Sequence, residues 1–328
     1  MLNVLFKKPW LASLEEGPEA AGPTLIQNEA SVVSPGTELA ILSGGEGWAP
    51  LPYVPGYGSV GRVLQAGPDC ARRGIQEGDR VFTYGKHAER VASDCVLVPV
   101  PEGLAPERAV LARMAAVSIT STRVSDIEFG DDVLVVGAGL VGLFAAQLAR
   151  LSGASVSVVD VAERRRAVAA ACGAERCFSP GPGLYDELRA ATGGELFHAV
   201  IEATGNPAAA EEAIRYVGRQ GELILLGSPR GPRQADLTPL LNRIHLCPDV
   251  VTVKGAHEWR FPTLRDDFVK HSLERNVELI LRAIASGRLL AEPLLTHVVP
   301  PSACVSVYAG LKDAKDSYLG VVYDWRKR

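Results

Sequence analysis

Short apolar runs alternate with amphipathic segments through the middle of the chain. The runs VLVVG, SVSVVD, AVIEAT and ELILLGS begin at positions 133, 155, 199 and 222, and segments of helical spacing separate them. Each run has the length and β-branched content of a buried strand. Because strands that alternate with helices form a parallel sheet covered on both faces, this region predicts a doubly wound α/β fold.

The regions on either side have a different pattern. Residues 1–105 contain short β-type runs such as SVGRVLQAG and DRVFTY, separated by Gly- and Pro-rich turns, which predicts a small, mostly β domain. A helix is expected over residues 109–122, and Leu273, Val277 and Ile280 mark a later amphipathic helix that stops at Gly287. The tail returns to short strands. We therefore expect one discontinuous domain, 1–108 with 257–328, and an inserted α/β domain over 109–256.

Composition excludes several classes of protein. The chain has 328 residues and a net charge of −4, which gives no electrostatic basis for binding nucleic acid or an anionic membrane. Its first residues, MLNVLFKKPW, lack the apolar core of a signal peptide, and no apolar run is long enough to span a bilayer. The six cysteines are scattered without C-x-x-C spacing. We expect a cytoplasmic protein that acts on a small molecule.

The first apolar run leads into a glycine-rich turn with the spacing G-x-G-x-x-G. Gly137 allows a tight turn, Gly139 lets a pyrophosphate approach the backbone, and Gly142 lets helix and strand pack closely. The helix that starts at Leu140 and Val141 offers free N–H groups to phosphates. An ordinary βα turn is the alternative. The preceding strand, the following helix and an acid about 20 residues later favour a dinucleotide site.

The acid at the end of the second apolar run concerns the choice of cofactor. Asp160 can accept the ribose hydroxyls of NAD and would repel the 2′-phosphate of NADP. Arg164, Arg165 and Arg166 follow closely and would soften that repulsion. A solvated helix face is the alternative for at least two of these three arginines. The remaining one, which we take to be Arg165, can lie flat on the adenine. The sequence favours NAD and leaves NADP open.

Six motifs, one of them the glycine-rich turn, occur together along nearly the whole chain. They are PYVPGYGSVGRV (52–63), QEGDRVF (76–82), HAERV (87–91), GAGLVG (137–142), EATGNP (202–207) and LLTHVVPPSACVSVYAGL (294–311). This set resembles the medium-chain dehydrogenase/reductase superfamily, whose type members are zinc alcohol dehydrogenases. SPGTELAILSG together with VPGYGSVG resembles a subgroup that includes bacteriochlorophyllide-a dehydrogenase.

The resemblance carries several implications. It implies a GroES-like, mostly β catalytic domain beside a Rossmann domain, and interconversion of a secondary alcohol and its ketone. Thr204 and Gly205, in the EATGNP motif, would then join the cofactor site. Members of this superfamily commonly join their nucleotide domains edge to edge, so a homodimer or homotetramer is expected.

The metal site of the zinc members is where this chain departs from the pattern. Their C-G-T/S-D motif is replaced by S-P-G-T-E at 34–38, and their G-H-E motif by Gly56-Tyr57-Gly58. The region after Met114 offers no cysteine, and the four-cysteine lobe for structural zinc is missing. Zinc requires three or four Cys, His or carboxylate ligands at one point. We expect no metal.

Without zinc, hydrogen-bond donors or a cation must stabilise the reacting oxygen. The resemblance places Thr37 at a relay hydroxyl and Tyr57 at a former ligand position. The catalytic candidates, in order of preference, are Thr37, Tyr57, His87, Lys254, Glu38 and His257. Each has a structural alternative: a turn hydroxyl, a space-filling ring, a buried histidine with a satisfied hydrogen bond, a solvated cation or a helix cap.

The sequence therefore predicts a zinc-independent, NAD-dependent alcohol dehydrogenase or ketoreductase. Trp48 and Trp259 are tryptophans that can stack on a sugar, cyclitol or flat ring, which favours a polyhydroxylated or ring-bearing substrate. Two alternatives stay open. One is an NADPH-dependent quinone or enoyl reductase, and the other is a non-catalytic protein that binds NAD(H).

Overall fold

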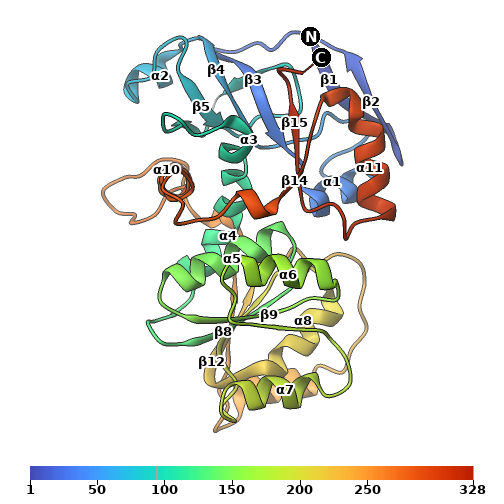
Figure 1. Cartoon of the computed structure of the whole chain (residues 1–328), viewed down its shortest axis with the longest axis vertical. Coiled ribbons are helices and arrows are strands. Elements are labelled where there is room, and N and C mark those ends of the chain that lie inside the picture. The colour runs from blue at the N-terminus through green and yellow to red at the C-terminus, as the bar shows by residue number, and fades with distance from the viewer. Residues whose placement is uncertain (94, 328) are drawn as a thin grey trace. The chain divides into compact units, whose positions relative to one another are not determined.

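The computed structural model describes residues 1–93 and 95–327, and the chain divides into two compact units. One unit joins Met1–Arg113 to Phe261–Arg328, and we call it the β unit; the other is Met114–Arg260, and we call it the α/β unit. Both chain ends belong to the β unit (Figure 1). The divisions fall a few residues beyond the expected positions 108 and 256.

The β unit is built from two sheets with short helices. Its strands are β1 (Leu2–Lys8), β2 (Leu11–Glu16), β3 (Thr24–Val32), β4 (Ser59–Gln65), β5 (Arg80–Thr83), β6 (Arg90–Ser93), β7 (Leu97–Pro99), β14 (Leu295–Val299) and β15 (Gly320–Asp324). Its helices are α1 (Pro35–Leu42), α2 (Pro68–Arg72), α3 (Pro106–Ala109), α10 (Leu273–Ala285) and α11 (Cys304–Asp313), with 3-10 turns at Glu292–Leu294 and Pro301–Ala303.

Strands from both ends of the chain share the larger sheet of this unit. Its order is β14-β15-β3-β4-β5-β7, with β6 also pairing to β3, while β1 and β2 form a separate hairpin. β15 pairs antiparallel to β3, with Val322 opposite Val32. β3 alternates buried and partly exposed residues along most of its length, as expected for a strand with one face on a core.

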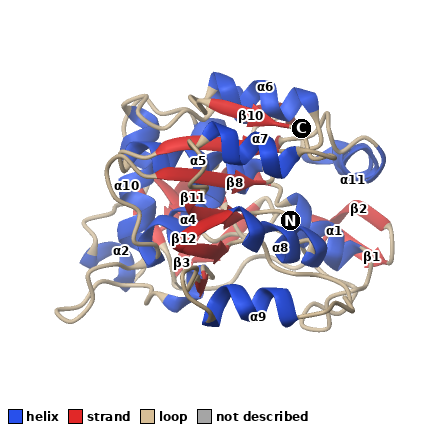
Figure 2. Cartoon of the chain, turned by 90° about the horizontal axis from the view of Figure 1, so that it is seen from below, coloured by secondary structure: helices blue, strands red, loops and turns tan. Residues whose placement is uncertain are grey.

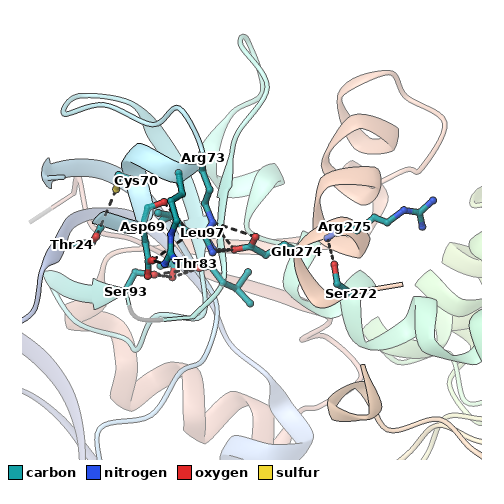
Figure 3. Close-up of polar contacts among 12 residues, drawn as sticks. Thr24, Asp69, Cys70, Arg73, Thr83, Ser93, Leu97, Ser272, Glu274 and Arg275 are labelled. Atoms are coloured by element: carbon teal, nitrogen blue, oxygen red, sulfur yellow. Dashed lines mark hydrogen bonds and ion pairs between the residues drawn. The ribbon is translucent and has the colours of Figure 1, made fainter. Parts of the chain in front are cut away.

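Helix α10 is also tied to the first segment of the chain. Ser272 caps it, accepting a hydrogen bond from the Arg275 N–H at 3.2 Å. Glu274, in its first turn, accepts from Nη2 of Arg73 at 2.8 Å and from the backbone N–H of Leu97, also at 2.8 Å (Figure 3). The amphipathic helix predicted from sequence is therefore anchored to the β unit by a residue on its polar side.

The α/β unit contains one parallel sheet covered by helices. Its strands are β8 (Asp132–Val136), β9 (Ser155–Val159), β10 (Arg176–Phe178), β11 (Phe197–Glu202), β12 (Val217–Leu225) and β13 (Thr252–Gly255). Its helices are α4 (Ala112–Val124), whose first two residues belong to the β unit, α5 (Leu140–Leu151), α6 (Glu163–Ala171), α7 (Leu184–Ala191), α8 (Pro207–Ala213) and α9 (Thr238–His245), with 3-10 turns at Ile214–Tyr216 and Glu258–Arg260.

The strand order β10-β9-β8-β11-β12-β13 confirms the predicted doubly wound fold. Helices α5 and α6 lie on one face of the sheet, and α7 and α8 lie on the other (Figure 1). Figure 2 shows α6 near the β10 end of the sheet and α9 at the opposite end, beyond β12. The order reverses between β8 and β11, and ligands bind at the carboxyl ends of strands at such a reversal. None of the helices in the described residues has the length and apolarity that a membrane crossing needs.

Candidate active site

The glycine-rich turn joins β8 to α5. It leaves no room for a side chain at Gly137 or Gly142 but has free space at Gly139. Gly137 has a φ of +98°, and a Cβ there would lie 2.6 Å from Cγ2 of Thr204. A Cβ on Gly142 would lie 1.9 Å from the carbonyl oxygen of Gly137. At Gly139, in contrast, a Cβ would meet no atom of the described residues within 4 Å. The turn is thus packed behind Gly137 and Gly142 and has free space at Gly139, as the pyrophosphate site requires.

The N-terminus of α5 follows directly. Gly139 is its N-cap residue, and it contributes no side-chain cap. The N–H groups of Leu140, Val141 and Gly142 lie in the first turn, where a helix has no internal acceptors. Together with the helix dipole, these groups form an anion site, so this part of the chain fits the phosphates of a dinucleotide.

Asp160 lies between this turn and the start of α6. Its Oδ2 accepts a hydrogen bond from the Ala138 N–H at 2.7 Å, and its Oδ1 accepts from the Ala162 N–H at 2.8 Å. A carboxylate has about four acceptor sites, so capacity for ribose hydroxyls is left over. Arg166 donates to the backbone oxygen of Asp160 at 2.7 Å, which fixes one of the three arginines. Arg165 is half-buried in the first turn of α6.

Glu202, which was not among the predicted site residues, organises the neighbouring turn. It ends β11 with its side chain buried, and its Oε1 accepts from the Thr204 N–H at 2.7 Å and from the Thr204 hydroxyl. Its Oε2 accepts from the Gly205 N–H at 3.3 Å. Burial raises the pKa of Glu202, and these hydrogen bonds only partly offset the effect. In the sequence, the position of Glu202 at the start of the EATGNP motif was the feature that could have identified it as a site residue.

In the β unit, the structure brings Thr37 and Tyr57 together. Tyr57 donates a hydrogen bond from its hydroxyl to Oγ of Ser34, the residue before α1, and it also bonds to the Thr37 side chain. Burial raises the pKa of Tyr57, whereas the Arg113 charge and the bonds to Ser34 and Thr37 act to lower it. Tyr57 and Thr37 are both half-buried. Ser34, which was not among the predicted candidates, completes a cluster of three hydroxyl groups.

His87 and Glu38 form a second, fully buried network. Nε2 of His87 lies 3.2 Å from Oε2 of Glu38, and Nδ1 of His87 lies 2.7 Å from Oγ of Ser31. Tyr308 donates to Oε2 of Glu38 at 2.6 Å. Glu38 also accepts from the Ser34 N–H at 2.8 Å, so it does cap the start of α1. Because neither side chain of the pair is exposed, these contacts favour the structural alternative for both residues.

Lys254 lies on the edge strand β13, away from the glycine-rich turn. Its Nζ is 2.6 Å from Oε2 of Glu222 and 2.5 Å from Oδ2 of Asp126. Burial would lower the pKa of Lys254, but these two carboxylates outweigh that effect and raise it. Glu222 is in register with Ala199, and Ala199 with Val133, near the amino end of the sheet. The geometry favours an ion pair that holds the sheet edge. His257, in the loop after β13, is exposed.

The side chains around Thr37 and Tyr57 do not fit a zinc ion. Across residues 1–93 and 95–327, no three His, Cys, Asp or Glu side chains converge as a metal site would require. Ser34, Thr37 and Tyr57 are hydroxyl donors, which are not the thiolate, imidazole or carboxylate ligands of protein zinc sites. Two groups of the right type, His87 and Glu38, are already bonded to each other.

Comparison with known proteins gives three kinds of match. A family model described as zinc-binding dehydrogenase matches residues 141–260. The chain is 29% identical over 283 residues to L-galactonate-5-dehydrogenase of Escherichia coli, covering 84% of this chain and 75% of that one. It is 25% identical to 2-desacetyl-2-hydroxyethyl bacteriochlorophyllide A dehydrogenase of Cereibacter sphaeroides, covering 96% and 94% of the two chains. The fold is similar to that of galactitol-1-phosphate dehydrogenase from Escherichia coli, with a TM-score of 0.84, 17% identity and coverage of 99% and 100%.

Proposed function

Because the chain belongs to the medium-chain dehydrogenase/reductase superfamily, as its motifs suggested, we propose that it is a zinc-independent, NAD-dependent alcohol dehydrogenase or ketoreductase. The relatives support oxidation and reduction of alcohols as the chemistry. The observation that carries the finer proposal is the cluster of Ser34, Thr37 and Tyr57, three hydrogen-bonded hydroxyl groups in which Tyr57 stands at a former ligand position of the zinc members.

The cofactor proposal rests on residues of the α/β unit. The free space at Gly139 and the first turn of α5 fit a pyrophosphate, and Asp160 fits an unphosphorylated ribose. Thr204 and Gly205, held by Glu202, border the same turn. When bound, the nicotinamide accepts or donates the hydride.

The chain's own residues would handle the proton. In alcohol oxidation, the substrate hydroxyl must lose a proton as the hydride leaves, and a positioned acid or base speeds that transfer. Tyr57 is the group to which we assign this proton, because its hydroxyl is already hydrogen-bonded to both Ser34 and Thr37. Thr37 would donate a hydrogen bond to the developing alkoxide.

The substrate class follows from the relatives and from one exposed aromatic residue. One relative acts on a sugar acid and another on a bacteriochlorophyllide, by their names. Trp48 is 63% exposed, and its indole N–H donates to Glu46 at 2.8 Å. An exposed indole face suits a sugar, cyclitol or flat ring. We propose a polyol, cyclitol, sugar or ring-bearing secondary alcohol.

We also propose a homodimer that acts in the cytoplasm. β13 is the last strand of the sheet, and Val253 on it is 39% exposed. The neighbouring α9 buries none of its residues and exposes Leu241, and Leu246 follows it. An unpaired edge beside exposed apolar side chains is a liability in solution unless another chain covers it.

The test begins with a screen of secondary alcohols, cyclitols and ketones, followed by NADH absorbance. Tyr57→Phe and Thr37→Val each remove one hydroxyl group and nearly keep the shape. If both groups bond the reacting oxygen in the transition state, each loss lowers turnover by roughly 100- to 1,000-fold, or about 2–4 kcal/mol.

NADH affinity should stay constant in both variants, because neither residue belongs to the nucleotide site. Turnover that persists in both would remove Thr37 and Tyr57 from the mechanism. Tight NADH binding without any substrate would favour the non-catalytic alternative, and a preference for NADPH would favour the quinone or enoyl reductase.

A further inference from the structure

Arg113 is a buried cation in the β unit. Its side chain is 2% exposed, which makes it one of the largest fully buried side chains of the described residues. Moving a charge out of water costs several kcal/mol unless the protein supplies compensating interactions. The position of this guanidinium group therefore requires a physical reason.

The guanidinium group lies over two tyrosine rings. Its Cζ lies 4.4 Å from the ring centroid of Tyr57 and 4.1 Å from that of Tyr84. Its Nε donates to the backbone oxygen of Tyr57 at 2.9 Å. Both distances are within the range of a cation–π interaction, which strengthens when the groups are desolvated. The contacts hold the positive charge on the face of the tyrosine to which we assign the proton.

Gly58 makes room for this arrangement. A Cβ on Gly58 would lie 2.5 Å from Cγ and 2.6 Å from Cβ of Arg113, so any side chain there would displace the arginine stem. Gly58 directly follows Tyr57 in the Gly56-Tyr57-Gly58 motif. The tyrosine, the glycine beside it and the distant arginine therefore form one packed set.

Two charged side chains act on Tyr57, and they have opposite signs. Arg113 lowers the pKa of Tyr57, and the Glu38 carboxylate raises it. Glu38 is bound by His87, the Tyr308 hydroxyl and the N–H of Ser34. Burial outweighs the other effects and leaves the pKa of Tyr57 above its ordinary value.

We propose that Arg113 is a positioning residue for the reaction, and that its guanidinium group takes over the electrostatic role of a metal by stabilising the phenolate form of Tyr57. This inference rests on the proposed function. In alcohol oxidation, Tyr57 would first release its own phenolic proton to solvent. The substrate O–H bond would then break and its proton would form the O–H bond on the phenolate oxygen of Tyr57, while the hydride from the substrate C–H bond would pass to the oxidised nicotinamide. In the reverse direction, Tyr57 returns the proton to the alkoxide oxygen. The charge of Arg113 stays constant throughout.

The direct test is the titration of Tyr57 in the whole protein without substrate. NMR of protein isotopically labelled at tyrosine Cζ reports each phenol, and the signal lost in Tyr57→Phe identifies the right one. An opposite charge within about 4–6 Å lowers a pKa by about one to three. In Arg113→Gln, the pKa of Tyr57 should therefore rise by about that amount. Arg113→Lys keeps the charge but loses the planar stack, and it should give a smaller rise.

The second readout is the pH profile of kcat/KM for alcohol oxidation. Its acidic limb, where kcat/KM rises as Tyr57 loses its proton, should move to higher pH in Arg113→Gln by the same amount as the titration, while NADH affinity stays unchanged. If Arg113 only supports packing, Arg113→Gln will lower the melting temperature but leave both the pKa of Tyr57 and the pH profile of kcat/KM unchanged. That result would overturn the inference.

Because a buried arginine is hard to replace, Gly58→Ala is the companion variant. It keeps the positive charge and displaces the Arg113 stem from Tyr57, so the pKa of Tyr57 should again rise. An unchanged titration in Gly58→Ala and in any folded Arg113 variant refutes the coupling. If the titration moves but turnover of both Tyr57→Phe and Arg113→Gln equals the wild type, the coupling stands and the proposed role of Tyr57 in catalysis is wrong.

Discussion

Nε2 of His87 lies 3.2 Å from Oε2 of Glu38, and neither side chain has contact with solvent. The same carboxylate accepts a hydrogen bond at 2.6 Å from the hydroxyl of Tyr308, a residue near the other end of the sequence. The first and last segments of the β unit are therefore joined through one buried acid.

The Tyr308→Phe variant tests the structural role of this network. It removes only the hydroxyl group and keeps the shape of the ring, so the buried carboxylate of Glu38 loses one hydrogen-bond donor. We expect the free energy of unfolding to fall by about 1–3 kcal/mol, measured in urea, with turnover per folded molecule unchanged. Tyr318→Phe is the matched control, because the Tyr318 ring stacks on His297 and does not contact Glu38 in the described contacts. A loss of turnover without a loss of stability would instead return His87 and Glu38 to the catalytic candidates.

Substitution of Asp160 tests the choice of cofactor. The wild type should bind NADH more tightly than NADPH, because a carboxylate pairs with ribose hydroxyls and repels a phosphate. Asp160→Ser should narrow or reverse that preference in titration calorimetry. Asp160→Asn removes the charge and keeps one oxygen, which can still accept from the Ala138 N–H, while the Ala162 N–H loses its acceptor. Comparison with Asp160→Ser then separates the repulsion of the phosphate from the loss of the Ala138 hydrogen bond. A wild-type preference for NADPH would contradict the proposal.

Two glycines of the same turn should respond differently to alanine. Gly139→Ala adds a methyl group to free space, so the melting temperature should hold while NADH affinity falls, because the pyrophosphate needs that space. Gly142→Ala forces a Cβ against the carbonyl oxygen of Gly137 and should lower stability as well. Thermal melts and calorimetry on the pair check this. Equal loss of stability in both variants would show that Gly139 is also a packing position.

Lys254→Met tests the ion pair at the sheet edge. Removing the ammonium group leaves Glu222 and Asp126 without this partner. We therefore expect the free energy of unfolding to fall by about 1 kcal/mol at most. Steady-state kinetics should match the wild type. A fall in turnover of the size expected for Tyr57→Phe would make Lys254 a catalytic group after all.

Light scattering tests the proposed dimer. The wild type should be a dimer at micromolar concentration, and Val253→Asp should shift it toward monomer because a charge on the edge strand opposes pairing. Leu64→Asp, a change at a comparably exposed position on β4, is the control and should leave the dimer intact. A monomeric wild type would contradict the proposal.

The sequence by itself determined the α/β unit and its cofactor turn. Periodicity, glycine spacing and the acid that ends a strand are local features, because a strand, a tight turn and a helix N-terminus each depend on a few neighbouring residues. The structure therefore has the predicted doubly wound parallel sheet, with Gly137, Gly139, Gly142 and Asp160 around one turn.

Only the tertiary structure decided which polar groups act together. Thr37 and Tyr57 were named from a family pattern, but Ser34 and Arg113 join them through contacts between residues far apart in the chain. The partners of Lys254 and the burial of His87 likewise depend on which strands and loops meet. Local spacing does not record such contacts, because packing of the whole unit fixes both the distance between two side chains and their exposure to water.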